Sequence, residues 1–183
     1  CALENVKQLQ GRYWQMLRNF ALLFSAILLL AACVDGGESR LGQDGKPLPR
    51  VYRIPNASKV QFRMLDSVNA LRSASGAPEL RLNARLNAAA ATHSRDMSIQ
   101  NRPWHFGSDG SSPLDRVQRV GYSGKLKGEA ISETYETELE TLSAWMEQPD
   151  TRAIILESSA TQMGFSWFQE NNGKIWWTMV VGG

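Results

Sequence analysis

Apolar side chains recur every three or four positions in four segments of the chain, and this spacing predicts four helices. The predicted helices cover residues 60–71, 82–97, 112–120 and 134–147. Gly76 and Pro78 end the first of them, while Ser112 as N-cap and Pro113 in the first turn begin the third. Its inward face is expected to carry Leu114, Val117 and Val120.

The alanine run Ala88–Ala91 in the second predicted helix indicates that another element packs closely against it. Towards the C-terminus the period changes to two, with aromatic and β-branched residues in 164–168 and 174–181. Asn172-Gly173 between these segments is a hairpin signal. Both faces of the last strand are apolar, so we expect cover on both sides. The pattern predicts an α+β fold in which helices cover both faces of a small antiparallel sheet.

The N-terminal part of the chain has the features of a bacterial export signal. The apolar run Phe20–Ala32 follows Arg12 and Arg18 and is shorter than the roughly 20 residues of a membrane-spanning helix. It ends in Leu30-Ala31-Ala32-Cys33, which resembles the lipoprotein box, in which the cysteine is lipidated. An uncleaved signal anchor with an incidental cysteine is the alternative.

These features divide the chain into three parts. We interpret residues 1–32 as a leader, in which 1–15 are untranslated and 16–32 form a signal peptide that starts at Met16. Glycine and proline among charges mark 33–57 as a flexible linker, lipid-anchored through Cys33. The folded domain is expected over 58–183.

Composition excludes several classes of function. The 183 residues suffice for one domain, and a hydrophobic content of 43% suits a packed core. Of 20 basic and 18 acidic side chains, three and one lie in residues 1–32, which leaves 17 of each sign. A neutral domain argues against nucleic acid as a partner. Cys1 and Cys33 are the only cysteines, so no disulfide or cysteine-based zinc site can form within the folded part.

Several short motifs follow one another in an order that resembles a known family. They are Asn69–Arg72 with Gly76, His93–Met97, the loop His105–Pro113, Gly121-Tyr122, Gly128-Glu129, Trp145-Met146 and Trp176–Thr178. In this order they resemble the bacterial branch of the CAP superfamily, the domains related to cysteine-rich secretory proteins, antigen 5 and plant pathogenesis-related proteins. The similarity covers roughly residues 60 to 183.

The resemblance implies an αβα sandwich with a cavity whose two histidines and two acidic residues can hold a divalent cation such as zinc. His105 and Glu129 match one member of each pair. Thr151 stands at the second histidine and Gln148 near the second acid, so half of the set is replaced. Zinc usually needs three or four protein ligands. We therefore assign no cofactor, and a divalent cation at His105 and Glu129 stays an open alternative.

The candidate site residues have a functional and a structural interpretation. His105 and Glu129 could be a ligand pair or an acid–base pair, but we favour a hydrogen-bonded pair that fixes the loop onto the sheet. His93 could replace the missing histidine, and we favour a core histidine with satisfied hydrogen bonds. The Gly/Ser/Asp loop could bind an anion, and we favour turn chemistry with an N-cap.

These observations lead to a primary hypothesis and an alternative. The primary one is a lipid-anchored, extracytoplasmic CAP domain, in the periplasm or on the cell surface, that acts as a binding or scaffold module. Its expected partners are the membrane through Cys33 and a lipid or cell-envelope ligand. The alternative is a metal-assisted, peptidase-like hydrolase centred on His105 and Glu129, completed by His93 or Asp150. We favour the module over the enzyme, and a structural protein without a ligand is a third hypothesis.

Overall fold

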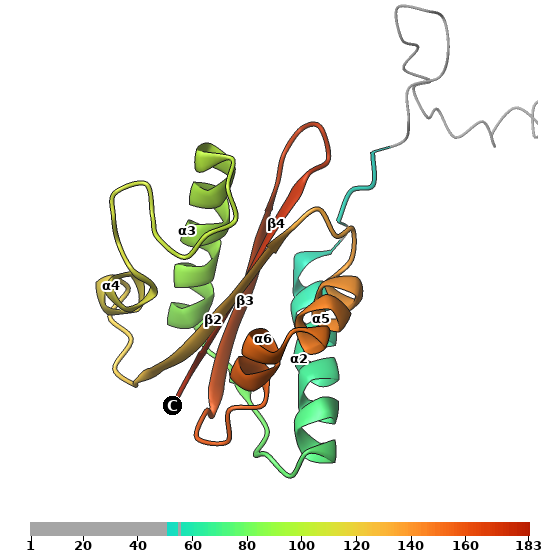
Figure 1. The fold of residues 1–183 in the computed structure, drawn as a ribbon, viewed down its shortest axis with the longest axis vertical. Helices are drawn as coiled ribbons and strands as arrows, with labels where there is room; N and C mark the ends of the chain where they lie inside the picture. The colour runs from blue at the N-terminus through green and yellow to red at the C-terminus, as the bar shows by residue number, and fades with distance from the viewer. Residues whose placement is uncertain (1–50, 55) are drawn as a thin grey trace, which may run out of the picture. The chain divides into compact units, whose positions relative to one another are not determined.

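The computed structural model describes residues 51–54 and 56–183. The predicted leader, most of the linker and Cys33 lie outside the described residues. In chain order the elements are α2 (Ala57–Ala74), β1 (Arg81–Leu82), α3 (Ala84–Gln100), α4 (Pro113–Arg119), β2 (Leu126–Glu133), α5 (Glu138–Glu147), α6 (Pro149–Ile155), β3 (Gln162–Gln169) and β4 (Ile175–Gly182) (Figure 1).

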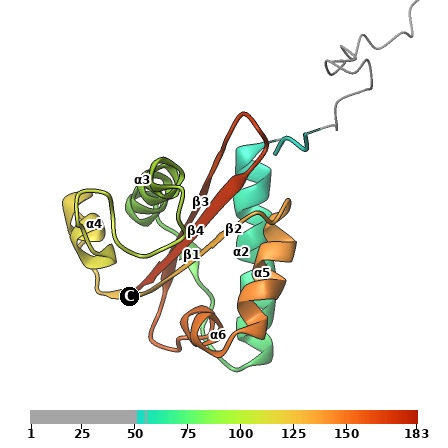
Figure 2. The same cartoon turned by 45° about the horizontal axis from the view of Figure 1, so that its top comes forward.

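The strands form one sheet in the order β1-β3-β4-β2. Both neighbours of β4 run antiparallel to it, and the two-residue β1 pairs parallel with β3. Helices α3 and α4 cover one face, while α2, α5 and α6 cover the other (Figure 2). The structure therefore confirms the αβα sandwich, with one short parallel pairing added to the antiparallel sheet.

Strand β4 lies in the middle of the sandwich, and all eight of its residues are buried. Trp177 and Met179 point into the core that α2, α5 and α6 close. Val180 points the other way, into the smaller cluster with Leu86 and Ala90 of α3. The two faces of β4 are therefore both covered, which confirms the prediction made from its apolar residues on both faces.

Helix α3 packs unusually close to the sheet. A Cβ at Gly164 in β3 would collide with the backbone of Leu86 and Asn87. Ala89 and Ala90 are buried on the same side of the helix. Small side chains on the helix and glycine on the strand let the two backbones approach, as the alanine run predicts. The close packing fixes the position of every side chain that α3 directs at the sheet.

Four elements differ from the pattern-based expectation. Strand β1 includes Leu82, which the pattern placed in the second helix, so α3 begins at Ala84. Strand β2 and helix α6 are additions, because the buried residues of β2 do not alternate cleanly and α6 is only seven residues long. Helix α5 begins at Glu138 rather than near Thr134. Thr134 has a positive φ of 84°, which no helix tolerates, and Thr137 forms the capping box with Glu140.

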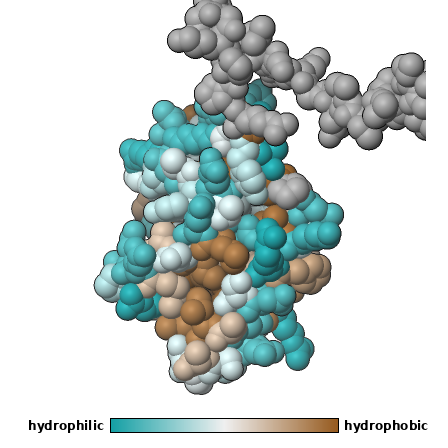
Figure 3. Space-filling view, turned by 90° about the vertical axis from the view of Figure 1, so that its right-hand side faces the viewer, coloured by the Kyte–Doolittle hydropathy of each residue, from teal (hydrophilic) through white to brown (hydrophobic). Residues whose placement is uncertain are grey.

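The face made by α2, α5 and α6 carries a hydrophobic area surrounded by hydrophilic side chains (Figure 3). Exposed apolar residues on these helices include Phe62 and Leu139. Within residues 51–54 and 56–183, no helix combines the length and the hydropathy needed to cross a membrane. Residues 50–183 form a compact unit with its own core, so we expect this unit to fold without the preceding segment.

Candidate functional site

The second half of α3 places His93 between the helix and the sheet. Its ring is fully buried, and the adjacent Ser94 donates a hydrogen bond to Thr178 of β4 at 2.8 Å. Nε2 of His93 lies 3.0 Å from the carbonyl oxygen of Trp104, so this nitrogen carries the proton and donates it. Nδ1 has no hydrogen-bond partner among the described residues. Burial lowers the pKa of His93. This effect outweighs the nearby Glu129 carboxylate, which alone would raise the pKa, so the ring is neutral.

The loop between α3 and α4 is held by turn chemistry. Asp96 accepts hydrogen bonds from the backbone N–H and the hydroxyl of Ser108, at 2.7 and 2.6 Å. Asp109 accepts the N–H of Ser111 at 3.0 Å. Ser112 caps α4 and forms a capping box with Asp115. The N–H groups of this loop serve turns and a cap, in agreement with the structural interpretation of its sequence.

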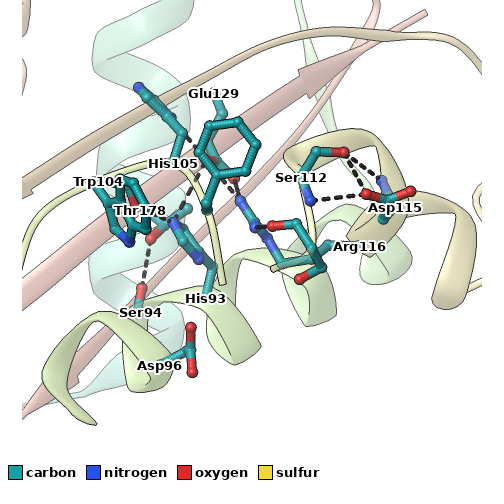
Figure 4. Close-up of polar contacts among 12 residues, drawn as sticks. His93, Ser94, Asp96, Trp104, His105, Ser112, Asp115, Arg116, Glu129 and Thr178 are labelled. Carbon is teal, nitrogen blue, oxygen red and sulfur yellow. Dashed lines mark hydrogen bonds and ion pairs between the residues drawn. The ribbon is translucent and has the colours of Figure 1, made fainter. Parts of the chain in front are cut away.

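Glu129 lies on β2 opposite Val180 and therefore faces α3 and α4. His105 donates from Nδ1 to Oε1 of Glu129 at 2.9 Å. Arg116 of α4 donates from one terminal nitrogen to both carboxylate oxygens, each at 2.8 Å. Figure 4 shows these contacts, and Glu129 and Arg116 are both buried. Glu129, His105 and Arg116 form a cluster with His93, whose Nε2 lies 3.6 Å from Oε1 of Glu129.

The charges of this cluster balance within the protein. Burial alone would raise the pKa of Glu129, but the hydrogen bond from His105, the proximity of His93 and the guanidinium of Arg116 together lower it. Glu129 is therefore a carboxylate, and Arg116 is its permanent counter-charge. Arg116 also donates to the carbonyl oxygen of Ser111 at 3.0 Å. The ion pair thus ties the loop, α4 and β2 together.

Two of the sequence-predicted cavity residues lie elsewhere. Thr151 belongs to α6, and its hydroxyl donates to the carbonyl oxygens of Trp145 and Gln148. Gln148 is an exposed residue between α5 and α6. Helix α6 covers the opposite face of the sheet from α3 and α4 (Figure 2). The structure therefore brings together His93, His105 and Glu129, and places Thr151 and Gln148 at the junction of two helices.

The donor set does not fit a divalent cation as it is arranged. Within the described part of the chain, no three His, Cys, Asp or Glu side chains form a group that could hold a metal ion. Both oxygens of Glu129 are bound by Arg116, and His105 directs Nδ1 at the same carboxylate. A metal would need these lone pairs for itself.

The sequence interpretation missed Arg116. It expected Leu114 to point inward from α4, and this is wrong: Leu114 is 49% exposed, whereas Arg116 and Val117 are buried. A helix of seven residues offers two turns of pattern, too few to fix which side faces the sheet. The available signal was a glutamate that follows a glycine in an inward position, with an arginine nearby in the sequence, since buried carboxylates require a partner.

Above this cluster the loop exposes an aromatic surface, formed by Arg102, Trp104 and Phe106. The rings of Trp104 and Phe106 lie 5.4 Å apart at 56°, and the guanidinium of Arg102 lies 3.3 Å from the centre of the Trp104 ring. Trp104 and Phe106 are 37% and 47% exposed. The His105 side chain between them is half-exposed.

Comparison with known proteins places these features in context. The model of the CAP, or cysteine-rich secretory protein, family matches residues 65–181. The uncharacterized protein YkwD of Bacillus subtilis is 28% identical over 127 residues, which are 69% of this chain and 49% of YkwD. The chain thus spans about half the length of this relative.

Solved structures show the same fold. An outer surface protein of Borrelia burgdorferi superposes with a TM-score of 0.64 at 14% identity, over 73% of this chain and 98% of that one. An extracellular protein of Bacillus anthracis that contains an SCP domain gives a TM-score of 0.60 at 21% identity, over 70% of this chain and 44% of that one. A cysteine-rich secretory protein of Staphylococcus aureus gives a TM-score of 0.56 at 13% identity, over 78% of this chain and 44% of that one.

Proposed function

Since this chain belongs to the cysteine-rich secretory protein family, we propose that it acts outside the cytoplasm as a lipid-binding module of the bacterial cell envelope. In this proposal Cys33 carries the lipid anchor, and the surface of Arg102, Trp104 and Phe106 binds the ligand. The extracellular and outer-surface relatives from Bacillus anthracis and Borrelia burgdorferi support the location.

One observation carries the proposal: two exposed aromatic rings stand on a loop whose backbone is firmly bound. The carbonyl oxygen of Trp104 accepts from His93, and that of Phe106 accepts from Gln100. Between them, His105 is bound to Glu129. A surface that is already ordered loses little conformational entropy when a ligand arrives. Exposed aromatic side chains in such a position typically mark an interaction site.

The chemistry of this surface favours a lipid with an anionic headgroup. Tryptophan is amphipathic and suits the boundary between an apolar phase and water. Arg102 adds a cation next to the rings, and an arginine near a membrane gains from anionic headgroups. Arg116 occupies both oxygens of Glu129, so the geometry does not favour the metal-assisted hydrolase.

Vesicle binding tests this function. Residues 34–183, without acyl chains, should float with phosphatidylglycerol vesicles more strongly than with phosphatidylcholine vesicles. Replacing both Trp104 and Phe106 with alanine should weaken binding at least about tenfold, because each lost ring removes over 1 kcal/mol of apolar contact. The readout is the fraction of protein bound against lipid concentration.

The matched control is the double variant Phe62→Ala and Leu139→Ala. These residues are 56% and 46% exposed on the α2 and α5 face, so a similar apolar area is removed from the other side of the molecule. It should bind vesicles like the unchanged protein. Equal losses in both double variants, or no binding by the unchanged protein, would contradict the proposal.

A further inference from the structure

Three groups with metal-binding chemistry meet at one buried point. Nδ1 of His105 and Nε2 of His93 lie 2.9 and 3.6 Å from Oε1 of Glu129. Ligands that share a zinc ion at about 2 Å in tetrahedral geometry lie about 3.3 Å from one another. The two distances bracket this value, but with Arg116 in place the three groups do not form a metal-binding group.

The cation already present at this point is a side chain. Arg116 donates to Oε1 and Oε2 of Glu129, each at 2.8 Å, from a position that is itself buried. A buried carboxylate needs a counter-charge and hydrogen bonds, because an unpaired one is very costly. The guanidinium meets both needs with one group.

A metal ion and Arg116 cannot occupy this point together. A divalent ion bound to Glu129 would lie within a few ångströms of the guanidinium, and like charges at that distance repel strongly in a buried site. Arginine cannot lose its proton to relieve the repulsion. Entry of a metal therefore requires Arg116 to leave, which would also break its bond to Ser111 and release the loop from α4.

We infer that Arg116 is a built-in substitute for a divalent cation: its guanidinium holds Glu129, His105 and the loop in place, keeps zinc out, and makes the site independent of metal supply. Removing the guanidinium should uncover a zinc site made of His93, His105 and Glu129. This inference goes beyond the proposed function and does not rest on lipid binding.

The test compares metal binding by residues 34–183 before and after the change Arg116→Met, which keeps an unbranched side chain but removes the charge. The unchanged protein should show no shift in unfolding temperature with zinc or with EDTA, and no zinc binding by calorimetry. The Arg116→Met variant should unfold at a lower temperature and bind one zinc ion. Zinc at about 100 times its dissociation constant should then raise its unfolding temperature by about 5 to 10 °C.

Two controls separate the cluster from incidental zinc binding. Arg119→Met changes an exposed arginine of the same helix, which pairs with Asp109, and should leave the protein without a zinc response. Adding Glu129→Gln to Arg116→Met should abolish the zinc response, because the carboxylate ligand is lost.

A second variant provides the test if Arg116→Met folds poorly. Arg116→Lys keeps the positive charge with a different shape, so it should fold with reduced stability and still exclude zinc. Stoichiometric zinc binding by the unchanged protein that depends on Glu129 would overturn the inference. So would an Arg116→Met protein that is as stable as the original and ignores zinc. Neither result depends on vesicle binding, so this test and that of the proposed function fail separately.

Discussion

Arg72, at the end of α2, is a second buried guanidinium, and it binds backbone rather than a carboxylate. It donates to four carbonyl oxygens, those of Pro78, Ile155, Glu157 and Ala160, at 2.7 to 3.0 Å. Burial lowers its pKa, though arginine remains charged in proteins. One side chain thus joins the end of α2 to the segment between α6 and β3.

Replacing Arg72 with methionine should lower the free energy of unfolding by about 3 kcal/mol or more. Buried carbonyl oxygens that lose their donor each cost about 1 to 3 kcal/mol. Urea unfolding followed by fluorescence measures the loss. Arg95→Met is the control, because Arg95 is exposed over the ring of Phe168 and such a contact contributes about 0.5 to 1 kcal/mol. Equal losses would show that Arg72 has no special role.

At the scale of single residues, the sequence predicted the pair of His105 and Glu129 but missed its partner, Arg116. Proximity of His105 and Glu129 could be expected from the order of the motifs, and the structure places them in hydrogen-bond contact. His93 could be assigned to an inward face because α3 is long enough to carry a clear pattern. Arg116 could not be assigned, because the side on which a seven-residue helix packs depends on tertiary contacts.

Among the elements, α3 and β3 approach so closely at Gly164 that no side chain fits between them. His93 and Ser94 reach the sheet only because Gly164 lets the helix approach. Changing Gly164 to alanine should therefore lower stability by at least about 2 kcal/mol, since the new methyl group meets backbone that cannot move aside. The hydrogen bond between Ser94 and Thr178 should weaken as the helix shifts.

Thermal unfolding and the NMR shift of the His93 ring measure these two effects. Gly76→Ala is a matched change: its φ of 73° disfavours alanine, but no atom lies within 4 Å of the new methyl group. It should cost about 1 kcal/mol through the backbone alone and leave the His93 signal unchanged. A Gly164→Ala protein as stable as Gly76→Ala would show that α3 does not depend on this close approach.

Elements with strong periodicity were predictable and those shaped by contacts were not. The hairpin of β3 and β4 follows from its alternation and from Asn172-Gly173. Strand β2 was missed because Glu129, a charged residue, occupies a buried position within it. A strand whose inward residue is a carboxylate is recognisable only with the arginine that neutralises it.

For the whole molecule, we expect stability to fall in two steps as the solution is acidified. The pKa of His93 is lowered in the folded state, so below its ordinary value near 6.5 the unfolded chain binds a proton that the folded protein resists. The free energy of unfolding should therefore decline from about pH 6.5 downwards, by at most about 1.4 kcal/mol per pH unit. His93→Gln should remove this first step.

The second step comes from carboxylates. Glu129 and Glu170 have pKa values below their ordinary value of 4.5, so their contribution is present above that pH and is lost as the pH falls through the folded values. Urea unfolding at pH 7.5, 5.5 and 4 distinguishes the two steps. A constant free energy between pH 7.5 and 5.5 in the unchanged protein would contradict the role of His93.

The sheet order also governs when this protein can fold. β4 is the last element of the described chain, yet it lies between β2 and β3, which share no pairing with each other. During synthesis the chain emerges from its N-terminus, so both flanking strands are made before the strand that joins them. Until residues 175–182 are available the sheet cannot close, and such long-range pairing is intrinsically slow. We therefore expect β2 and β3 to stay without their central pairing partner until β4 has been made, so any interruption before residue 175 leaves both strands with unpaired edges.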